Sequence, residues 1–100
     1  MPYVLSTAAD EDAYAIIAEA MRLDPRRARV IDAELEDLLE RIGENPGIGA
    51  RKAALTARPY RFKLFRERWW VVYTDVPKGQ MVQVVRILWV HADLVNALLD

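Results

Sequence analysis

The spacing of apolar residues changes once along this 100-residue chain, and that change restricts the folds it can adopt. Up to Gly43, apolar residues recur every three or four positions, as on one face of an α-helix. From Tyr60 onward they alternate with polar residues or form short β-branched and aromatic runs, as in strands. Helices followed by neighbouring strands predict an α+β protein in which helices pack on an antiparallel sheet.

Two helices are expected in the first half of the chain. Thr7, followed by an aspartate three positions later, fits an N-cap box, and the helix it starts runs to about Leu23. Asp24 and Pro25 then supply a capping carboxylate and a proline at the first helical position. They predict a second helix that ends at Gly43. Because the turn between the helices is very short, we expect an antiparallel helical hairpin.

The expected order of elements is βααβββα, in a single domain over residues 1–100. A short strand precedes the hairpin, and a mobile stretch follows it. The last three strands are joined by tight turns, so they are expected to form an antiparallel meander before a short C-terminal helix. The predicted ranges are 3–7 for the first strand, 46–57 for the mobile stretch, 60–64, 69–75 and 81–88 for the meander, and 91–99 for the last helix.

The first strand of the meander has a regular alternation. Tyr60, Phe62 and Leu64 alternate with Arg61 and Lys63. Since successive side chains of a strand point to opposite faces, one face is expected to be buried and the other basic. A phosphate group could then bridge the two cations of the basic face.

Composition excludes several classes of protein. The chain has no cysteine, which excludes disulfides, thiol nucleophiles and cysteine-ligated metals, and it has one histidine, His91. We therefore expect no metal and no cofactor. No apolar run approaches the roughly 20 residues that span a membrane, and the start lacks the pattern of a secretory signal. A cytoplasmic protein without a membrane partner is expected.

The net charge of −1 conceals two halves of opposite sign. Residues 1–50 hold 11 acidic and 5 basic side chains, whereas residues 51–100 hold 9 basic and 4 acidic ones. A basic second half indicates a polyanion or an acidic protein as its partner. The alternative is a solvated positive surface without a partner.

Three stretches together resemble the RelE/ParE superfamily of type II toxin–antitoxin toxins. Residues 3–10 are similar to the family's start, and residues 39–49 to the run with proline and glycine that closes its second helix. Residues 58–66, 70–73 and 84–88 are similar to its last three strands. The resemblance implies a plasmid-stabilisation type of toxin, held inactive in a hetero-oligomer by an antitoxin whose disordered segment wraps it. Many members have a histidine where this chain has Trp89; here the histidine stands two residues later.

The resemblance leaves two modes of action open. RelE-like toxins cut mRNA on the ribosome, which without a metal requires proton-transfer groups and cations around the phosphate. Arg61, Lys63 and Arg86 are the candidates for charge stabilisation, with Tyr73 or His91 for proton transfer. Arg86 interrupts an apolar strand, so it is either functional or a structural arginine that holds a terminal carboxylate or a carbonyl.

ParE-like toxins bind DNA gyrase and inhibit growth, which requires a recognition surface and no proton transfer. The sequence pI of about 5.8 favours this branch, because a protein that enters an RNA-lined site gains from a strongly positive charge. Candidate contacts for a target or an antitoxin are Arg58, Arg61, Lys63, Arg86 and Trp89. A member that binds its antitoxin without being toxic is a third possibility.

Overall fold

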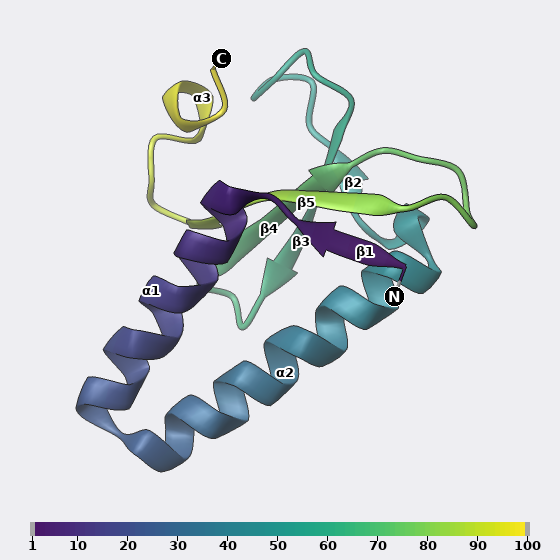
Figure 1. Ribbon diagram of the computed structural model, residues 1–100. Coiled ribbons are helices and arrows are strands. Elements are labelled where there is room, and N and C mark those ends of the chain that lie inside the picture. Colours follow the sequence, from purple (N-terminus) through teal and green to yellow (C-terminus); the bar gives the residue numbers. More distant parts are fainter. Residues whose placement is uncertain (1, 100) are drawn as a thin grey trace.

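The computed structural model describes residues 2–99, and in them an α-helical hairpin packs against a twisted sheet (Figure 1). The elements are β1 (Tyr3–Leu5), α1 (Thr7–Leu23), α2 (Pro25–Glu44), the 3₁₀ turn η1 (Pro46–Ile48), β2 (Ala50–Arg51), β3 (Tyr60–Phe65), β4 (Trp69–Thr74), β5 (Val82–Trp89) and α3 (Leu94–Ala97). The predicted α+β architecture and the predicted order of its main elements are confirmed. None of the helices in this described part is long and apolar enough to cross a bilayer.

The sheet contains five strands in the order β1-β5-β4-β3-β2. β3, β4 and β5 form the predicted antiparallel meander, and β1 pairs in parallel with β5. The expectation of a mobile stretch over residues 46–57 is wrong for its first half, which forms η1 and β2. β2 has only two residues, both exposed, so the sequence carries no alternation that could reveal it.

Some helix boundaries differ from the prediction. Ser6, not Thr7, caps α1: its hydroxyl accepts from the Ala9 amide at 3.0 Å and donates to the Val85 carbonyl at 2.8 Å. The Asp24 cap of α2 is confirmed. Gly43 lies inside α2 instead of ending it. Its missing side chain serves close packing, since a Cβ there would come within 2.5 Å of the Pro2 ring.

The sheet is covered on both faces. The main core lies between the sheet and the hairpin, whereas α3 lies on the other side of the sheet (Figure 1). There a second cluster is formed by Phe62, Val72, Leu88 and Leu98. The prediction of one buried and one basic face for β3 is therefore wrong. Phe65, which shares a face with the basic residues of β3, packs in the main core, while Leu64 is 38% exposed.

The outer edge of β5 is closed by side chains of α1. β1 pairs only with Val82–Val84, so the rest of this edge has no neighbouring strand. Asp12 of α1 fills the gap: its Oδ2 accepts from the Ile87 amide at 2.9 Å. This contact fixes the start of the hairpin against the sheet and satisfies a backbone donor that would otherwise lack a partner.

Candidate functional site

The five candidate nuclease residues do not converge on one site. Arg61 is the cross-strand neighbour of Tyr73, whereas Trp89, two positions before His91, pairs with Trp69 at the other end of β4. Four residues along a strand correspond to about 13 Å. The expected proton-transfer groups, a tyrosine and a histidine, therefore stand at opposite ends of the sheet.

Tyr73 is fully buried and its hydroxyl has both hydrogen-bonding functions occupied. It donates to the Pro46 carbonyl at 2.6 Å and accepts from the Gly49 amide at 2.8 Å. Burial raises the pKa of this phenol, which stabilises its protonated form. A hydroxyl without solvent contact cannot exchange a proton with a bound nucleic acid, so Tyr73 anchors η1 to the sheet.

Arg61 is held in an ion-pair network that the sequence did not reveal. Its Nε donates to Asp75 at 2.8 Å and its Nη1 to the Gly49 carbonyl at 2.7 Å. Arg51 of β2 pairs with the same carboxylate at 3.1 Å. Lys63 lies apart from this network, beside a shallow pocket next to the end of α2. A phosphate between Arg61 and Lys63 would have to share the Arg61 guanidinium with Asp75, which is already bound to its Nε.

The Asp75 network predicts an acid-sensitive contribution to stability. The hydrogen bond from Arg61, and then that from Arg51, holds the pKa of Asp75 below its usual value. A carboxyl whose folded pKa is lowered stabilises the fold above its unfolded pKa, near 4, and loses that contribution as pH falls through the folded pKa. We expect the unfolding free energy of Asp75→Asn to fall less than that of the wild type between about pH 5 and pH 3. Urea unfolding across this range measures the difference; equal slopes would contradict the expectation.

Arg86 is held by a carboxylate, but its partner is the side chain of Asp12 and not the expected terminal carboxylate or carbonyl. Its Nε and Nη2 donate to the two carboxylate oxygens of Asp12 at 2.8 and 3.1 Å. Both side chains are partly buried, and the second cluster of the core lies on the same face of the sheet. The arginine therefore joins β5 to α1, and a role in binding would have to use the part of its guanidinium that stays exposed.

The two remaining candidates lie on the surface at opposite ends of the sheet. Trp89 is 55% exposed, and its ring meets that of His91 edge to face, with centroids 4.8 Å apart. Arg58 is exposed just before β3, close in sequence to Arg61. Within residues 2–99, no three histidine or carboxylate side chains are arranged to hold a metal.

An apolar depression of the surface lies between the hairpin and the start of β4, and we call it the hairpin groove. Its volume is about 480 Å³. Its apolar wall is formed by Ala15, Ile16, Ala20, Leu23, Ile31 and Trp69. Leu23 is 68% exposed, and Trp89 extends this apolar surface because it is the cross-strand neighbour of Trp69.

The rim of the hairpin groove offers positive charge. Glu19 is already paired with Arg22 at 2.6 Å, and Asp24 caps α2. Arg27 and Arg68 also line the groove, and neither forms an ion pair with any residue the structure describes. An apolar wall with two available arginines fits a protein segment that carries aliphatic side chains and carboxylates. The sequence could not reveal this groove, since its walls come from segments about 50 residues apart.

Comparison with known proteins decides the family. Residues 3–90 match the model of the ParE toxin of the type II toxin–antitoxin system parDE. The chain belongs to the ParE toxin family. This ParE family member also shares its fold with a chain in the solved structure of the chromosomal ParDE toxin–antitoxin system from P. aeruginosa. The two are 20% identical with a TM-score of 0.72, over 91% of this chain and 97% of the other. The search of curated proteins gave no match.

Proposed function

We propose that this ParE-family toxin inhibits growth by binding DNA gyrase in the cytoplasm, without catalysing a reaction itself. The observation that carries the proposal is the dispersal of the groups that RNA cleavage would require. Tyr73 is buried and bonded to the backbone of η1, and Arg61 and Arg86 are paired with carboxylates. His91 lies at the end of the sheet opposite Tyr73. Membership of the ParE family supports the same conclusion.

A cognate antitoxin is the second proposed partner, and the hairpin groove is its proposed docking site. An acidic, amphipathic segment would place apolar side chains against Leu23 and Trp69 and carboxylates near Arg27 and Arg68. Trp89 would extend the contact along the sheet. Toxin and antitoxin would then form a hetero-oligomer in which the exposed apolar surface is covered.

Expression of the chain alone in bacterial cells tests the proposed target. We expect growth arrest with induction of the DNA-damage response and with gyrase trapped on cleaved DNA. The RelE-like alternative predicts instead that translation stops within minutes and that mRNAs are cut inside reading frames. Normal growth despite soluble, folded protein would favour a non-toxic member that only binds its antitoxin.

The docking site is tested separately by Leu23→Glu. We expect a decrease of tenfold or more in affinity for the antitoxin encoded beside the toxin gene, because a carboxylate would enter the apolar wall. Met81→Glu is the matched control, since Met81 is 58% exposed but lies outside the groove. Titration calorimetry measures both affinities. An equal loss in the two variants, or none in either, would place the antitoxin elsewhere.

A further inference from the structure

Between its Asp24 cap and its last turn, α2 carries charges in the reverse of the order that a helix dipole favours. Carboxylates are favourable near the positive N-terminal end of the helix dipole and cations near the C-terminal end. After the Asp24 cap, the first turn of α2 instead has no acidic residue, and it contains Arg26 and Arg27. Its second half carries Glu36, Asp37 and Glu40. Arg41 in the last turn follows the usual order. The charges from Arg26 to Glu40 do not, and an interaction outside the chain would account for them.

Some of these charges lie on the face of α2 opposite its buried residues, which we call the outer stripe. It consists of Arg26, Arg29, Ala33, Glu36 and Glu40, of which Glu40 is half-buried and the others are exposed. These residues are spaced alternately by three and four positions, as in the contact seam of a coiled coil. The buried residues Ala28, Ile31, Leu35, Leu38 and Ile42 have the same spacing and pack against the rest of the protein, so the outer stripe points away from it.

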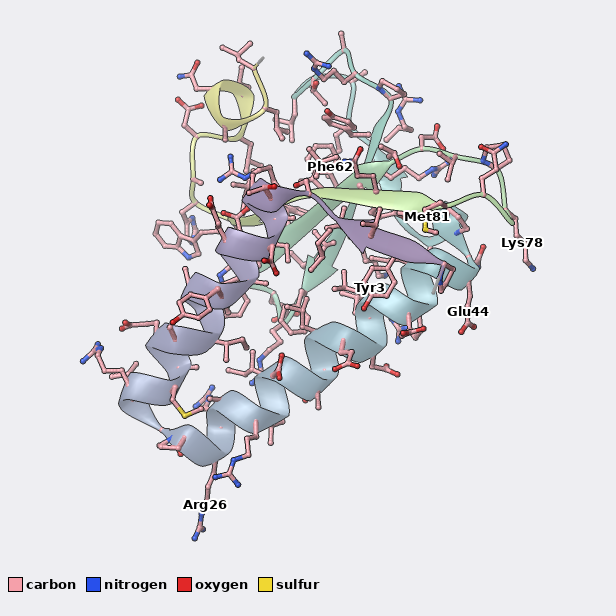
Figure 2. All side chains as sticks on the ribbon, in the orientation of Figure 1. Tyr3, Arg26, Glu44, Phe62, Lys78 and Met81 are labelled. Carbon is pink, nitrogen blue, oxygen red and sulfur yellow. The ribbon has the colours of Figure 1, made fainter. Side chains whose placement is uncertain are left out.

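The charged groups of the outer stripe are available for a partner. Arg26 projects into solvent beyond the turn of the hairpin (Figure 2). None of the four charged residues of the stripe forms an ion pair with any side chain in residues 2–99. By contrast Glu34, outside the stripe, is paired with Arg66 of the turn between β3 and β4.

We propose that the outer stripe binds a second copy of this chain, with the two α2 helices antiparallel about a two-fold axis near Ala33. In this arrangement Arg29 faces Glu36 of the second copy, and Arg26 faces Glu40 of the second copy. Two-fold symmetry repeats both pairs, so four ion pairs form along a stripe of about 21 Å.

The middle of the stripe is suited to close approach of two helices. Ala33 has a small side chain and stands at the centre of the symmetric arrangement, where a larger residue would hold the helices apart. Val30, which is 52% exposed, flanks the stripe and would lose part of its contact with water in the dimer. With so little apolar area, charge complementarity is the main attraction, and the association is expected to weaken in salt.

The proposed dimer contact is separate from the proposed antitoxin site. The hairpin groove lies on the sheet side of the hairpin, and none of its lining residues belongs to the outer stripe. We can therefore test the α2 dimer and the antitoxin site separately.

Sedimentation velocity with charge-reversed variants tests the proposal. One variant, Arg26→Glu with Arg29→Glu, makes the stripe wholly acidic; the other, Glu36→Lys with Glu40→Lys, makes it wholly basic. In about 50 mM salt we expect the wild type to dimerise as the protein concentration increases. In about 500 mM salt the dimerisation affinity should be at least tenfold lower. Each variant alone should be monomeric, and an equimolar mixture should form heterodimers. Circular dichroism checks that both variants fold.

Lys78→Glu is the control, because Lys78 lies in the turn before β5, far from the turn of the hairpin (Figure 2). It should dimerise as the wild type does. The proposal is overturned if the wild type stays monomeric up to about 1 mM, a concentration at which even weak association is detectable. It is equally overturned if the mixed variants stay monomeric, or if dimers persist in either variant alone. The last result would mean that the copies meet through another surface.

Discussion

Replacement of Tyr73 by phenylalanine is expected to lower the unfolding free energy by about 2–4 kcal/mol. The hydroxyl donates to the Pro46 carbonyl and accepts from the Gly49 amide, and its removal leaves both backbone groups without that partner. The ring itself still fits, since the side chain is fully buried in the main core. For a protein of this size, such a loss corresponds to a decrease in melting temperature of about 10 °C or more. Thermal and urea unfolding measure it.

Tyr14→Phe provides the matched control. Tyr14 is 77% exposed, so the same change of a hydroxyl to hydrogen should alter the unfolding free energy by less than about 0.5 kcal/mol. The Tyr73 variant also separates structure from catalysis. If Tyr73 is an anchor, the folded fraction of the variant keeps its inhibitory activity. A loss of activity by orders of magnitude in a stably folded variant would identify Tyr73 as a catalytic residue.

The second large effect is expected at Asp12. Asp12→Ala removes two hydrogen bonds from Arg86 and one from the Ile87 amide, and it leaves a partly buried guanidinium without its partner. We expect a loss of about 2–3 kcal/mol, which is less than for a fully buried pair because both side chains keep some contact with water. Equilibrium unfolding in urea measures it.

The exposed pair of Glu19 and Arg22 provides the comparison for Asp12. Both of its side chains are more than half exposed, and Glu19→Ala should therefore lower the unfolding free energy much less than Asp12→Ala does. Similar losses for the two variants would mean that the pair of Arg86 with Asp12 is no stronger than an ordinary surface contact. The interpretation of Arg86 as a structural residue would then be wrong.

The sequence predicted the main elements well because their signals are local. The Asp24-Pro25 cap and the regular apolar spacing of α2 depend only on neighbouring residues, and so does the alternation in β3. What the sequence could not predict depends on contacts between distant residues. Leu64 alternates like a core residue yet is 38% exposed, because α3 and its neighbours do not cover that end of the strand.

The roles of the candidate site residues depend even more on contacts between residues that are distant in the sequence. Arg61, Arg86 and Tyr73 attract notice in the sequence as polar groups among apolar residues, which is also how buried structural anchors look. Their partners, Asp75, Asp12 and the backbone of residues 46 and 49, lie 14 to 74 positions away in the chain. Only the tertiary structure distinguishes a group held in place from a group available to a ligand. It also brings Leu23 and Trp69 together in one groove.

The central claim is that this ParE-family toxin acts on gyrase by binding. It is tested most directly by mixing the purified chain with purified DNA gyrase, ATP and plasmid, and by measuring the DNA left cleaved after detergent denaturation. We expect cleaved DNA to increase with toxin concentration, equally for the wild type and for His91→Ala. No gyrase-dependent cleavage, together with cutting of mRNA on purified ribosomes that His91→Ala abolishes, would contradict the account.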